Sequence, residues 1–373
     1  MMKKIIVIGG GIAGASAAYY LSKQPCEVIL IDREDPGQAT GAAAGIICPW
    51  LSQRRNKKWY FLVKEGAAYY PELIEELQCD GETDTGYKKT GGIALHAERS
   101  KRDKMMERAI EKREEAPEIG EINAIDDEQI KQLFPYLTEE YHGLHVTGAA
   151  RVDGRKLRQS LIRAMQKNGG QLITGDAQLQ SDETKSVTVL VNGKRHSADR
   201  IILAAGAWAP EVLKNLHIKI DVSYQKAQIS HLGVAEETSE LPVVMPPGDQ
   251  YLLAFDDQRI VAGTTHENDR PMDDKITAGG IAEIMGKTLA VAGHLSEAEY
   301  LETRVGYRPF TPGFLPVAGP FPHIPKLLFI NGLGSSGLTS GPFIGKEVAK
   351  IALGQESNIN PEDYPVENII KER

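Results

Sequence analysis

The sequence predicts a mixed α/β fold, α+β overall, in which a domain with helices on a parallel sheet is joined to a second domain with a mainly antiparallel sheet. Three observations predict it. The chain has 373 residues, more than one hydrophobic core usually serves, which favours two domains. A strand, a glycine-rich turn, a helix and a second strand follow one another in residues 5–32. Alternating apolar residues near 224–232, 251–254 and 259–262 predict antiparallel strands.

The composition is that of an ordinary folded protein, with 41% hydrophobic and 25% charged residues. A net charge of −8 argues against nonspecific binding to nucleic acid. No apolar run reaches the ~18 residues of a membrane helix, and three glycines interrupt the N-terminal apolar stretch, which argues against a secretion signal. Three cysteines without CxxC spacing and nine scattered histidines predict neither a disulfide framework nor a metal site. A reduced, cytoplasmic setting is therefore expected.

The first 35 residues carry a dinucleotide-binding pattern. Residues 9–14, Gly-Gly-Gly-Ile-Ala-Gly, directly follow a short apolar strand and open a helix, and the second strand ends at Asp32. Gly9 permits the tight turn, Gly11 lets the backbone approach a pyrophosphate, and Gly14 allows close packing of helix on strand. The helix N-terminus favours a negative group, and the Asp32 carboxylate can accept hydrogen bonds from ribose hydroxyls.

Two further segments favour FAD over NAD as the dinucleotide. Residues 38–47 are small and then apolar, which suits a loop lying flat against an extended cofactor; an Ala-rich helix start is the alternative. An apolar strand at 200–203 runs into Ala204-Ala205-Gly206-Ala207-Trp208, after a hairpin with an Asn192-Gly193 turn. Such a late return of the chain would bring backbone beside the cofactor.

N-cap residues and the helical spacing of apolar residues predict most of the other helices. Asp126 and Asp153 are N-cap residues for two of them. A second Gly/Ser-rich turn, residues 331–341, follows an apolar strand at 327–330 and precedes a helix expected at 342–353, repeating the arrangement of the N-terminus. The other helices are expected at 57–77, 97–115, 127–134, 154–168 and 276–292.

Taken together, residues 9–14, 32, 40–47, 205–208, 306–309 and 331–337 make the chain resemble the D-amino acid oxidase family of FAD enzymes. That family includes glycine oxidase, sarcosine oxidase and the small subunit of bacterial D-amino acid dehydrogenase. The resemblance covers nearly the whole chain, and its most specific parts are the Gly-Tyr-Arg-Pro motif with the following Thr-Pro-Gly-Phe-Leu-Pro-Val-Ala-Gly, and the second Gly/Ser-rich turn. It implies a discontinuous, Rossmann-like FAD-binding domain and a substrate-binding domain. The expected FAD-binding segments are 1–80, 150–220 and 311–373, and the substrate-binding segments are 81–149 and 221–310.

The resemblance also implies a reaction. A deprotonated amine of a small amino acid or secondary amine (a D-amino acid, glycine or an N-methyl amino acid) would deliver hydride from its α carbon to flavin N5, and water would hydrolyse the imine. Arg308 matches the arginine that clamps the substrate carboxylate bidentately, with a structural ion pair as the alternative. Tyr251 matches a tyrosine near that carboxylate, with an ordinary strand aromatic as the alternative, and His266 is expected to face the same cavity. The reaction needs no strong general base if the amine binds in its neutral form, because orientation and electrostatic anchoring then suffice, and the catalytic residues stay unknown.

Two departures from relatives matter. Glycine oxidase has a second arginine where the 334–336 turn lies, and this chain has serines there, so a preference for glycine does not follow. Sarcosine oxidase attaches its flavin through a cysteine after the arginine motif, and no cysteine lies there in this chain, so noncovalent FAD is expected. The positions that match the family's cofactor contacts are Gly9, Gly11, Ile12, Ala13, Gly14, Asp32, Arg33, Thr40, Ala43, Ala44, Gly45, Ile47, Ala177, Ala205, Gly206, Trp208, Gly334, Ser335, Ser336, Gly337, Leu338 and Thr339.

The expected partners are an amine or amino acid and oxygen or another electron acceptor, with no nucleic acid. Peripheral membrane association, if the enzyme is a dehydrogenase, and a homo-oligomer stay open. Two alternative functions also stay open: an FAD oxidoreductase acting on a hydroxy acid or polyol, and a flavin-binding protein without turnover.

Overall fold

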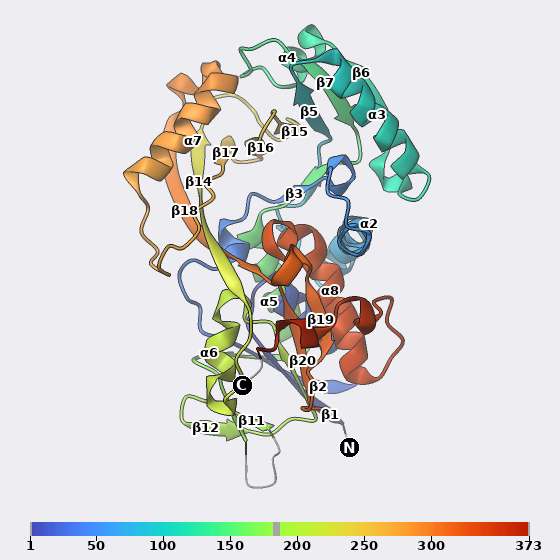
Figure 1. Ribbon diagram of the computed structural model, residues 1–373, viewed down its shortest axis with the longest axis vertical. Coiled ribbons are helices and arrows are strands. Elements are labelled where there is room, and N and C mark those ends of the chain that lie inside the picture. Colours follow the sequence, from blue (N-terminus) through green and yellow to red (C-terminus); the bar gives the residue numbers. More distant parts are fainter. Residues whose placement is uncertain (1, 182–186, 372–373) are drawn as a thin grey trace.

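The computed structural model describes residues 2–181 and 187–371, and Figure 1 shows them as two lobes along the long axis. The lower lobe is built on a six-stranded sheet of order β19-β20-β13-β1-β2-β9, in which only β19 runs antiparallel to its neighbour. A three-stranded antiparallel sheet, β10-β11-β12, lies beside it. Their bounds are β1 (Lys3–Ile8), β2 (Cys26–Asp32), β9 (Gln171–Thr174), β10 (Gln178–Ser181), β11 (Val187–Val191), β12 (Lys194–His196), β13 (Arg200–Leu203), β19 (Val317–Pro320) and β20 (Leu327–Asn331).

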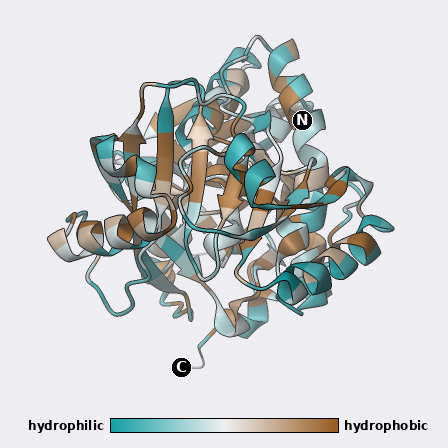
Figure 2. Ribbon diagram, turned by 90° about the horizontal axis from the view of Figure 1, so that it is seen from above, coloured by the Kyte–Doolittle hydropathy of each residue, from teal (hydrophilic) through white to brown (hydrophobic). Residues whose placement is uncertain are grey.

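The parallel sheet is buried on both faces, which explains the continuous apolar runs of its central strands. On β1, Ile5 and Val7 pack into the core beneath the helices, whereas Ile6 and Ile8 pack against the small sheet on the other side. Seen from above, Figure 2 shows strands coloured as hydrophobic toward the middle of the molecule and hydrophilic stretches on the helices at its edge. The helices of this lobe are α1 (Ile12–Ser22), α2 (Lys57–Cys79), α5 (Gly154–Lys167), α6 (Ala209–Leu213) and α8 (Gly337–Leu353).

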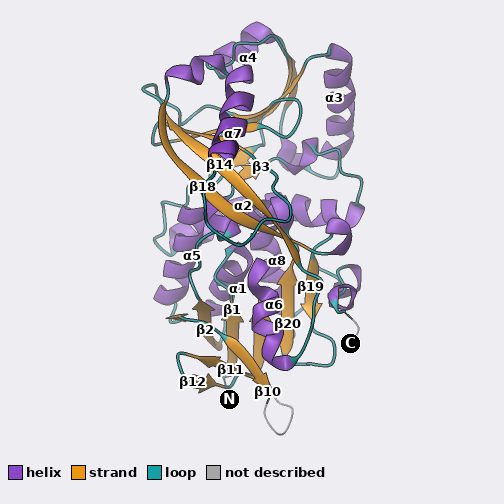
Figure 3. Ribbon diagram, turned by 60° about the vertical axis from the view of Figure 1, so that its left-hand side comes forward, coloured by secondary structure: helices purple, strands orange, loops and turns teal. Residues whose placement is uncertain are grey.

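The upper lobe is built on an eight-stranded sheet of order β18-β14-β17-β16-β15-β5-β7-β6. Every neighbouring pair is antiparallel except β15 with β5, so the expected mainly antiparallel sheet is present. Its long strands β14 and β18 cross into the lower lobe (Figure 3). The bounds are β5 (Gly92–His96), β6 (Ile122–Ile125), β7 (His142–Val146), β14 (Ser223–Gly233), β15 (Val243–Met245), β16 (Tyr251–Phe255), β17 (Arg259–Gly263) and β18 (Glu299–Phe310), with helices α3 (Arg99–Arg113), α4 (Asp127–Leu133) and α7 (Ala278–Val291).

The large sheet has one face toward helix α7 and the other toward the lower lobe. Leu252 and Ile260 pack with Ile284 of α7, whereas Leu253 and Val261 belong to a separate apolar cluster on the opposite face. That second face therefore forms the roof of any space between the lobes. A short sheet of β3 (Ile46–Ile47), β8 (Ala150–Arg151) and β4 (Lys88–Lys89) joins segments from both. Among the described helices, none is long and apolar enough to cross a membrane.

The largest difference from the expected elements is the start of α8. The sequence predicts a helix from Pro342, but the helix begins at Gly337 and Pro342 lies inside it. Proline cannot donate to the carbonyl four residues earlier, which belongs to Leu338. The hydroxyl of Tyr70, on α2, donates to that carbonyl instead. A tertiary contact thus replaces the missing bond, and the prediction of the helix start was wrong for this reason.

A buried ion pair joins the two lobes. Asp153 caps α5 by accepting from the backbone of Arg155 and Lys156, and its other oxygen lies 2.9 Å from Arg259 Nη2 on β17. The two side chains are only 6% and 9% exposed. We expect Arg259→Met to lower the free energy of unfolding by about 3 kcal/mol, because it leaves the buried carboxylate unpaired. Thermal melting checks this against Arg195→Met, an exposed position with the same change in charge; equal melting temperatures for the two variants would contradict it.

His231, beside this pair on β14, is expected to make the stability of the protein sensitive to acid. It is 1% exposed and its Nδ1 lies 2.9 Å from Arg259 Nη1, which must be the donor. Burial, with the charges of Arg304 and Arg259, lowers the pKa of His231 to about 3. An unfolded histidine has a pKa of about 6.5, so below that pH protons favour the unfolded chain, and above it the residue has no effect.

We therefore expect His231 to cost roughly 2 kcal/mol of stability between pH 6.5 and pH 5, at about 1.4 kcal/mol per pH unit. His231→Gln should show a smaller loss of stability over this range than the wild type, measured by denaturant unfolding at each pH. The exposed variant His217→Gln should keep the wild-type profile. A His231→Gln profile parallel to that of the wild type would exclude the effect.

Candidate active site

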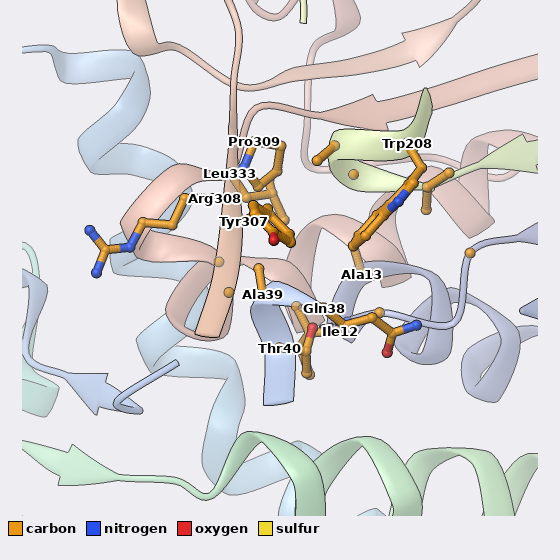
Figure 4. Close-up of a pocket in the computed structure, with 18 of the residues that line it drawn as sticks. Ile12, Ala13, Gln38, Ala39, Thr40, Trp208, Tyr307, Arg308, Pro309 and Leu333 are labelled. Atoms are coloured by element: carbon orange, nitrogen blue, oxygen red, sulfur yellow. Dashed lines mark hydrogen bonds between the residues drawn. The ribbon is translucent and has the colours of Figure 1, made fainter. Parts of the chain in front are cut away.

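One long cleft runs between the lobes, from the ends of β1 and β2 to strands β14, β16 and β18. Figure 4 shows a close-up of it with lining residues such as Thr40, Trp208 and Arg308. Its lower part is lined by Gly9, Gly11, Ile12, Ala13, Asp32, Arg33, Thr40, Ala177, Ala205, Gly206 and Trp208. Its central and upper parts are lined by Ala43, Ala44, Gly45, Gly334, Ser335, Gly337, Leu338, Tyr251 and Arg308. The structure therefore brings most of the residues singled out from the sequence to a single site, although they come from seven separate stretches of chain.

The glycine-rich turn has the geometry expected for a pyrophosphate-binding backbone. Gly9 has φ +99°, and a Cβ there would lie 2.5 Å from the carbonyl oxygen of Ala204. At Gly11 a Cβ would meet only Thr40 Oγ1, at 3.4 Å, so this residue leaves the backbone open toward the cleft. Helix α1 begins at Ile12 without a side-chain cap on Gly11, and one N–H of its first turn, that of Ile12, donates to Thr40 Oγ1 at 2.9 Å. The positive end of α1 therefore faces the cleft.

Asp32 is buried at the edge of the same turn. Its carboxylate accepts from the backbone N–H of Gly10, from Gln38 Nε2 at 2.8 Å and from Arg158 Nη2 at 3.3 Å. The carboxylate thus holds the turn while it lines the cleft. The neighbouring Arg33 has a different environment, because its guanidinium pairs with three carboxylates, those of Asp35, Asp176 and Glu211.

The middle of the cleft is formed by two backbone segments with small side chains. After a 3-10 turn at Ala39–Ala42, the chain is extended through Gly45, where φ is +94° and a Cβ would lie 1.8 Å from the carbonyl oxygen of Val152. The loop expected at 38–47 is therefore present, with only one short turn of helix. From the other side, the N-terminus of α8 meets the cleft, again without a side-chain cap. Two helix N-termini, small-residue walls and an acid where a ribose is expected fit FAD.

Arg308 closes the upper end of the cleft. Its Nη2 donates to Thr264 Oγ1 at 2.9 Å, its Nη1 contacts Gln225 Oε1 at 3.4 Å, and it is hydrogen-bonded to Tyr251. Among the described residues, no carboxylate lies within 4.0 Å of this guanidinium. Burial lowers the pKa of Arg308, and Tyr251 and Asp249 act in the opposite direction. A largely buried cation held by neutral groups is suited to bind an external carboxylate.

Tyr307, the neighbour of Arg308 on β18, points to the other side of the strand (Figure 4). Its ring packs edge-on against Trp208, with centroids 6.0 Å apart, and against Tyr224 at 5.6 Å. A Cβ on Gly37 would lie 2.3 Å from this ring, so glycine is required there. The Gly-Tyr-Arg-Pro motif thus contributes an aromatic wall in one direction and the arginine in the other.

Five predicted residues lie outside the lining of the cleft. Gly14 packs α1 onto the turn, since a Cβ there would lie 1.8 Å from the carbonyl oxygen of Gly9. Ser336 and Thr339 are turned to other partners, Trp59 Nε1 and the carbonyl of Ile46, and Ile47 lies in the core of the lower lobe. His266 was expected to face the cavity, but its Nδ1 pairs with Asp249 at 3.2 Å and the residue is 40% exposed.

Several lining residues were missed from the sequence. Tyr307 and Pro309 belong to the Gly-Tyr-Arg-Pro motif, so the sequence could have indicated that they line the cleft. Gln225 is not in the lining, but it lies opposite Arg308 in the pairing of β14 with β18, and only the strand register reveals this neighbour. The other missed residues include Gln38, Ala39, Ala42, Ile46, Ala227 and Leu333. None of the three cysteines lines the described cleft, so noncovalent FAD remains the expectation.

Comparison with known proteins agrees with this geometry. Residues 4–351 match the family of DAO, FAD-dependent oxidoreductases. An uncharacterized oxidoreductase, YurR of Bacillus subtilis, is 53% identical over 365 residues, covering 97% of this chain and 98% of the relative. Glycine oxidase of Pseudomonas putida is 26% identical over 372 residues, 98% of this chain and 99% of the relative.

Solved structures of amine and amino acid oxidases are also similar to this chain. Iminodiacetate oxidase from Chelativorans sp. BNC1 superimposes with a TM-score of 0.93 at 40% identity, covering 96% of this chain and 98% of that one. Glycine oxidase from Geobacillus kaustophilus, 21% identical, superimposes with a TM-score of 0.83 over 96% of this chain and 97% of that one, and shows the shared fold. FAD is the cofactor of the matching family. With its glycine-rich turn, its arginine-closed cleft and this match over almost its whole length, the chain belongs to the DAO family of FAD-dependent oxidoreductases.

Proposed function

We propose that this protein oxidises the C–N bond of a small amino acid or secondary amine to an imine, which water then hydrolyses. The observation that carries the proposal is Arg308, a largely buried guanidinium without an acidic partner among the described residues, at the end of a cleft that fits FAD. Bound FAD would supply the oxidant, accepting two electrons as a hydride from the carbon beside the nitrogen. The task of the protein is then to hold that carbon in place.

Named residues support this task. Arg308 and Tyr251 would bind the substrate carboxylate, and Gln225 and Thr264 keep the guanidinium oriented. Ile46 and Met245 pack beside the apolar cluster on the roof of the cleft and would exclude water from the reacting carbon. An apolar environment also disfavours a charged ammonium, so it favours the neutral amine from which hydride can leave. No separate base is needed in this scheme.

The comparisons support a secondary amine in particular. The 40% identity to iminodiacetate oxidase exceeds the 26% identity to glycine oxidase of P. putida. The turn at 334–336 has serines where glycine oxidase is expected to carry an arginine, which also supports a substrate other than glycine. We therefore propose an N-substituted glycine as the preferred substrate type.

The test is reduction of the FAD-loaded enzyme without oxygen. Glycine, sarcosine, iminodiacetate, L-proline and a set of D-amino acids are added in turn, and loss of the visible flavin absorbance is recorded. We expect sarcosine or iminodiacetate, as N-substituted glycines, to reduce the flavin, and hydrolysis of the imine to release an amine and a carbonyl product. Reduction by hydroxy acids alone would replace the proposal with an alcohol oxidoreductase, and a flavin that no compound reduces would favour a binding protein without turnover. Admitting air to the reduced enzyme then separates an oxidase from a dehydrogenase.

A further inference from the structure

We propose that Arg54 forms a second anion-binding position at the mouth of the active site, so that the preferred substrates are secondary amines with two carboxylates. One carboxylate would bind Arg308, and the other would meet Arg54. The inference rests on the proposed function, because it concerns the substrate of the same site.

Arg54 is connected through Trp59 to the turn that forms one wall of the cleft. It follows the short turn at Pro49–Leu51 and precedes α2, and its guanidinium lies 4.7 Å over the ring of Trp59. Trp59 Nε1 in turn donates to Ser336 Oγ at 3.2 Å. Ser335, the residue before Ser336 in that turn, is exposed and lines the cleft. Trp59 and Ser336 therefore link the cation to the wall of the cleft.

A second chain of contacts links Arg54 to the strand that carries Arg308. Arg54 donates from Nη2 to the carbonyl of Phe314, and the Phe314 ring packs edge-on against Phe310 with centroids 5.3 Å apart. Phe310 is two residues after Arg308 on β18, so both side chains leave the same face of the strand. Phe310 also fills the space beside Gly334, where a Cβ would lie 2.7 Å from its ring. Phe314 and Phe310 thus connect Arg54 to the strand that carries Arg308 and to the turn at Gly334.

The charge of Arg54 is not balanced by the surrounding side chains. Among the described residues, no carboxylate lies within 4.0 Å of it, whereas Arg33 pairs with three. Arg54 is partly buried, and burial lowers its pKa. The carbonyl of Phe314 accepts from one of its five N–H donors, so others remain for a ligand.

The indole ring also fixes the direction of this cation. A guanidinium stacked on an aromatic face is held in a plane and can present its N–H edge to a carboxylate. A monocarboxylic amine leaves this donor edge without a partner, and a substrate with a second carboxylate would supply one. The structure thus favours dicarboxylic over monocarboxylic secondary amines.

The experiment compares iminodiacetate with sarcosine, which differ in the second carboxylate. We expect Arg54→Gln to lower kcat/KM for iminodiacetate about tenfold or more, the effect of losing one charge-assisted contact, and to change kcat/KM for sarcosine less than about twofold. Arg55→Gln is the matched control, because Arg55 is the exposed neighbour and the variant has the same net charge. It should change neither value. Flavin content and melting temperature of each variant establish that the fold is kept.

A third compound separates charge from size. N-(carbamoylmethyl)glycine replaces one carboxylate of iminodiacetate by an uncharged amide of nearly the same shape. The wild type should prefer iminodiacetate over this compound, and Arg54→Gln should lose most of that preference, whereas Arg54→Lys should keep part of it. Preservation of the preference in Arg54→Gln would overturn the inference.

The remaining outcomes also decide the matter. Equal losses for iminodiacetate and sarcosine would assign Arg54 a structural role beside Trp59, and no loss for either would remove it from the site. A wild type reduced by sarcosine but not by iminodiacetate would refute this inference and leave the proposed function standing. A wild type that no amine reduces would overturn both.

Discussion

Replacing Arg308 with methionine is expected to lower kcat/KM for the amine substrate by about a hundred- to a thousandfold. The guanidinium closes the cleft, is largely buried and has no carboxylate partner among the described residues, so a substrate carboxylate would lose its main counter-charge. Removing one member of a buried charge pair costs about 2–5 kcal/mol, and each 1.4 kcal/mol is tenfold. Stopped-flow reduction of the FAD-loaded variant without oxygen measures the effect on the chemical step directly.

The control for this variant is Arg308→Lys, which keeps the charge but cannot bind both carboxylate oxygens in the same plane. It should recover part of the loss. Both variants should hold FAD as the wild type does, because the glycine-rich turn and Asp32 lie at the other end of the cleft. An Arg308→Met enzyme with the kcat/KM of the wild type would remove Arg308 from the substrate site.

The second large effect is expected at Gly14, whose replacement by alanine should leave the protein without FAD. A Cβ there would lie 1.8 Å from the carbonyl oxygen of Gly9, which is backbone and cannot rotate away. The turn must therefore shift, and the N-terminus of α1 shifts with it. We expect the affinity for FAD to fall by about a hundredfold or more, on the order of 3 kcal/mol. The ratio of flavin to protein after purification, and titration of the apoprotein with FAD, measure it.

Gly286→Ala is the matched control for the Gly14 variant. Gly286 is in the interior of α7, and a Cβ there would have no neighbour within 4 Å. This variant should bind FAD normally and be up to about 1 kcal/mol more stable, since alanine favours helices over glycine. Gly14→Ala protein with a full complement of flavin would show that the close packing of α1 is not needed for binding.

Local features of the sequence were sufficient for much of the fold. The glycine-rich turn between β1 and α1 could be predicted from residues 9–14, because this glycine spacing directly after an apolar strand is a short-range pattern. Asp126 and Asp153 cap α4 and α5 as expected, because a capping side chain bonds to backbone within three residues. The Asn192-Gly193 turn likewise joins β11 and β12. The match to the DAO family confirms the family predicted from the longer motifs.

The tertiary structure decided what depends on residues far apart in the chain. Gln225 lies beside Arg308 only because β14 and β18 pair in one register, and a shift of one residue would turn the side chain to the other face. Helix α8 starts before Pro342 because Tyr70 supplies the hydrogen bond that proline cannot. The environment of Arg54 needs Trp59, Phe314 and the distant serine turn in one place. The sequence by itself determined the motifs, because each is a short-range pattern, whereas their neighbours depend on packing, which no local pattern encodes.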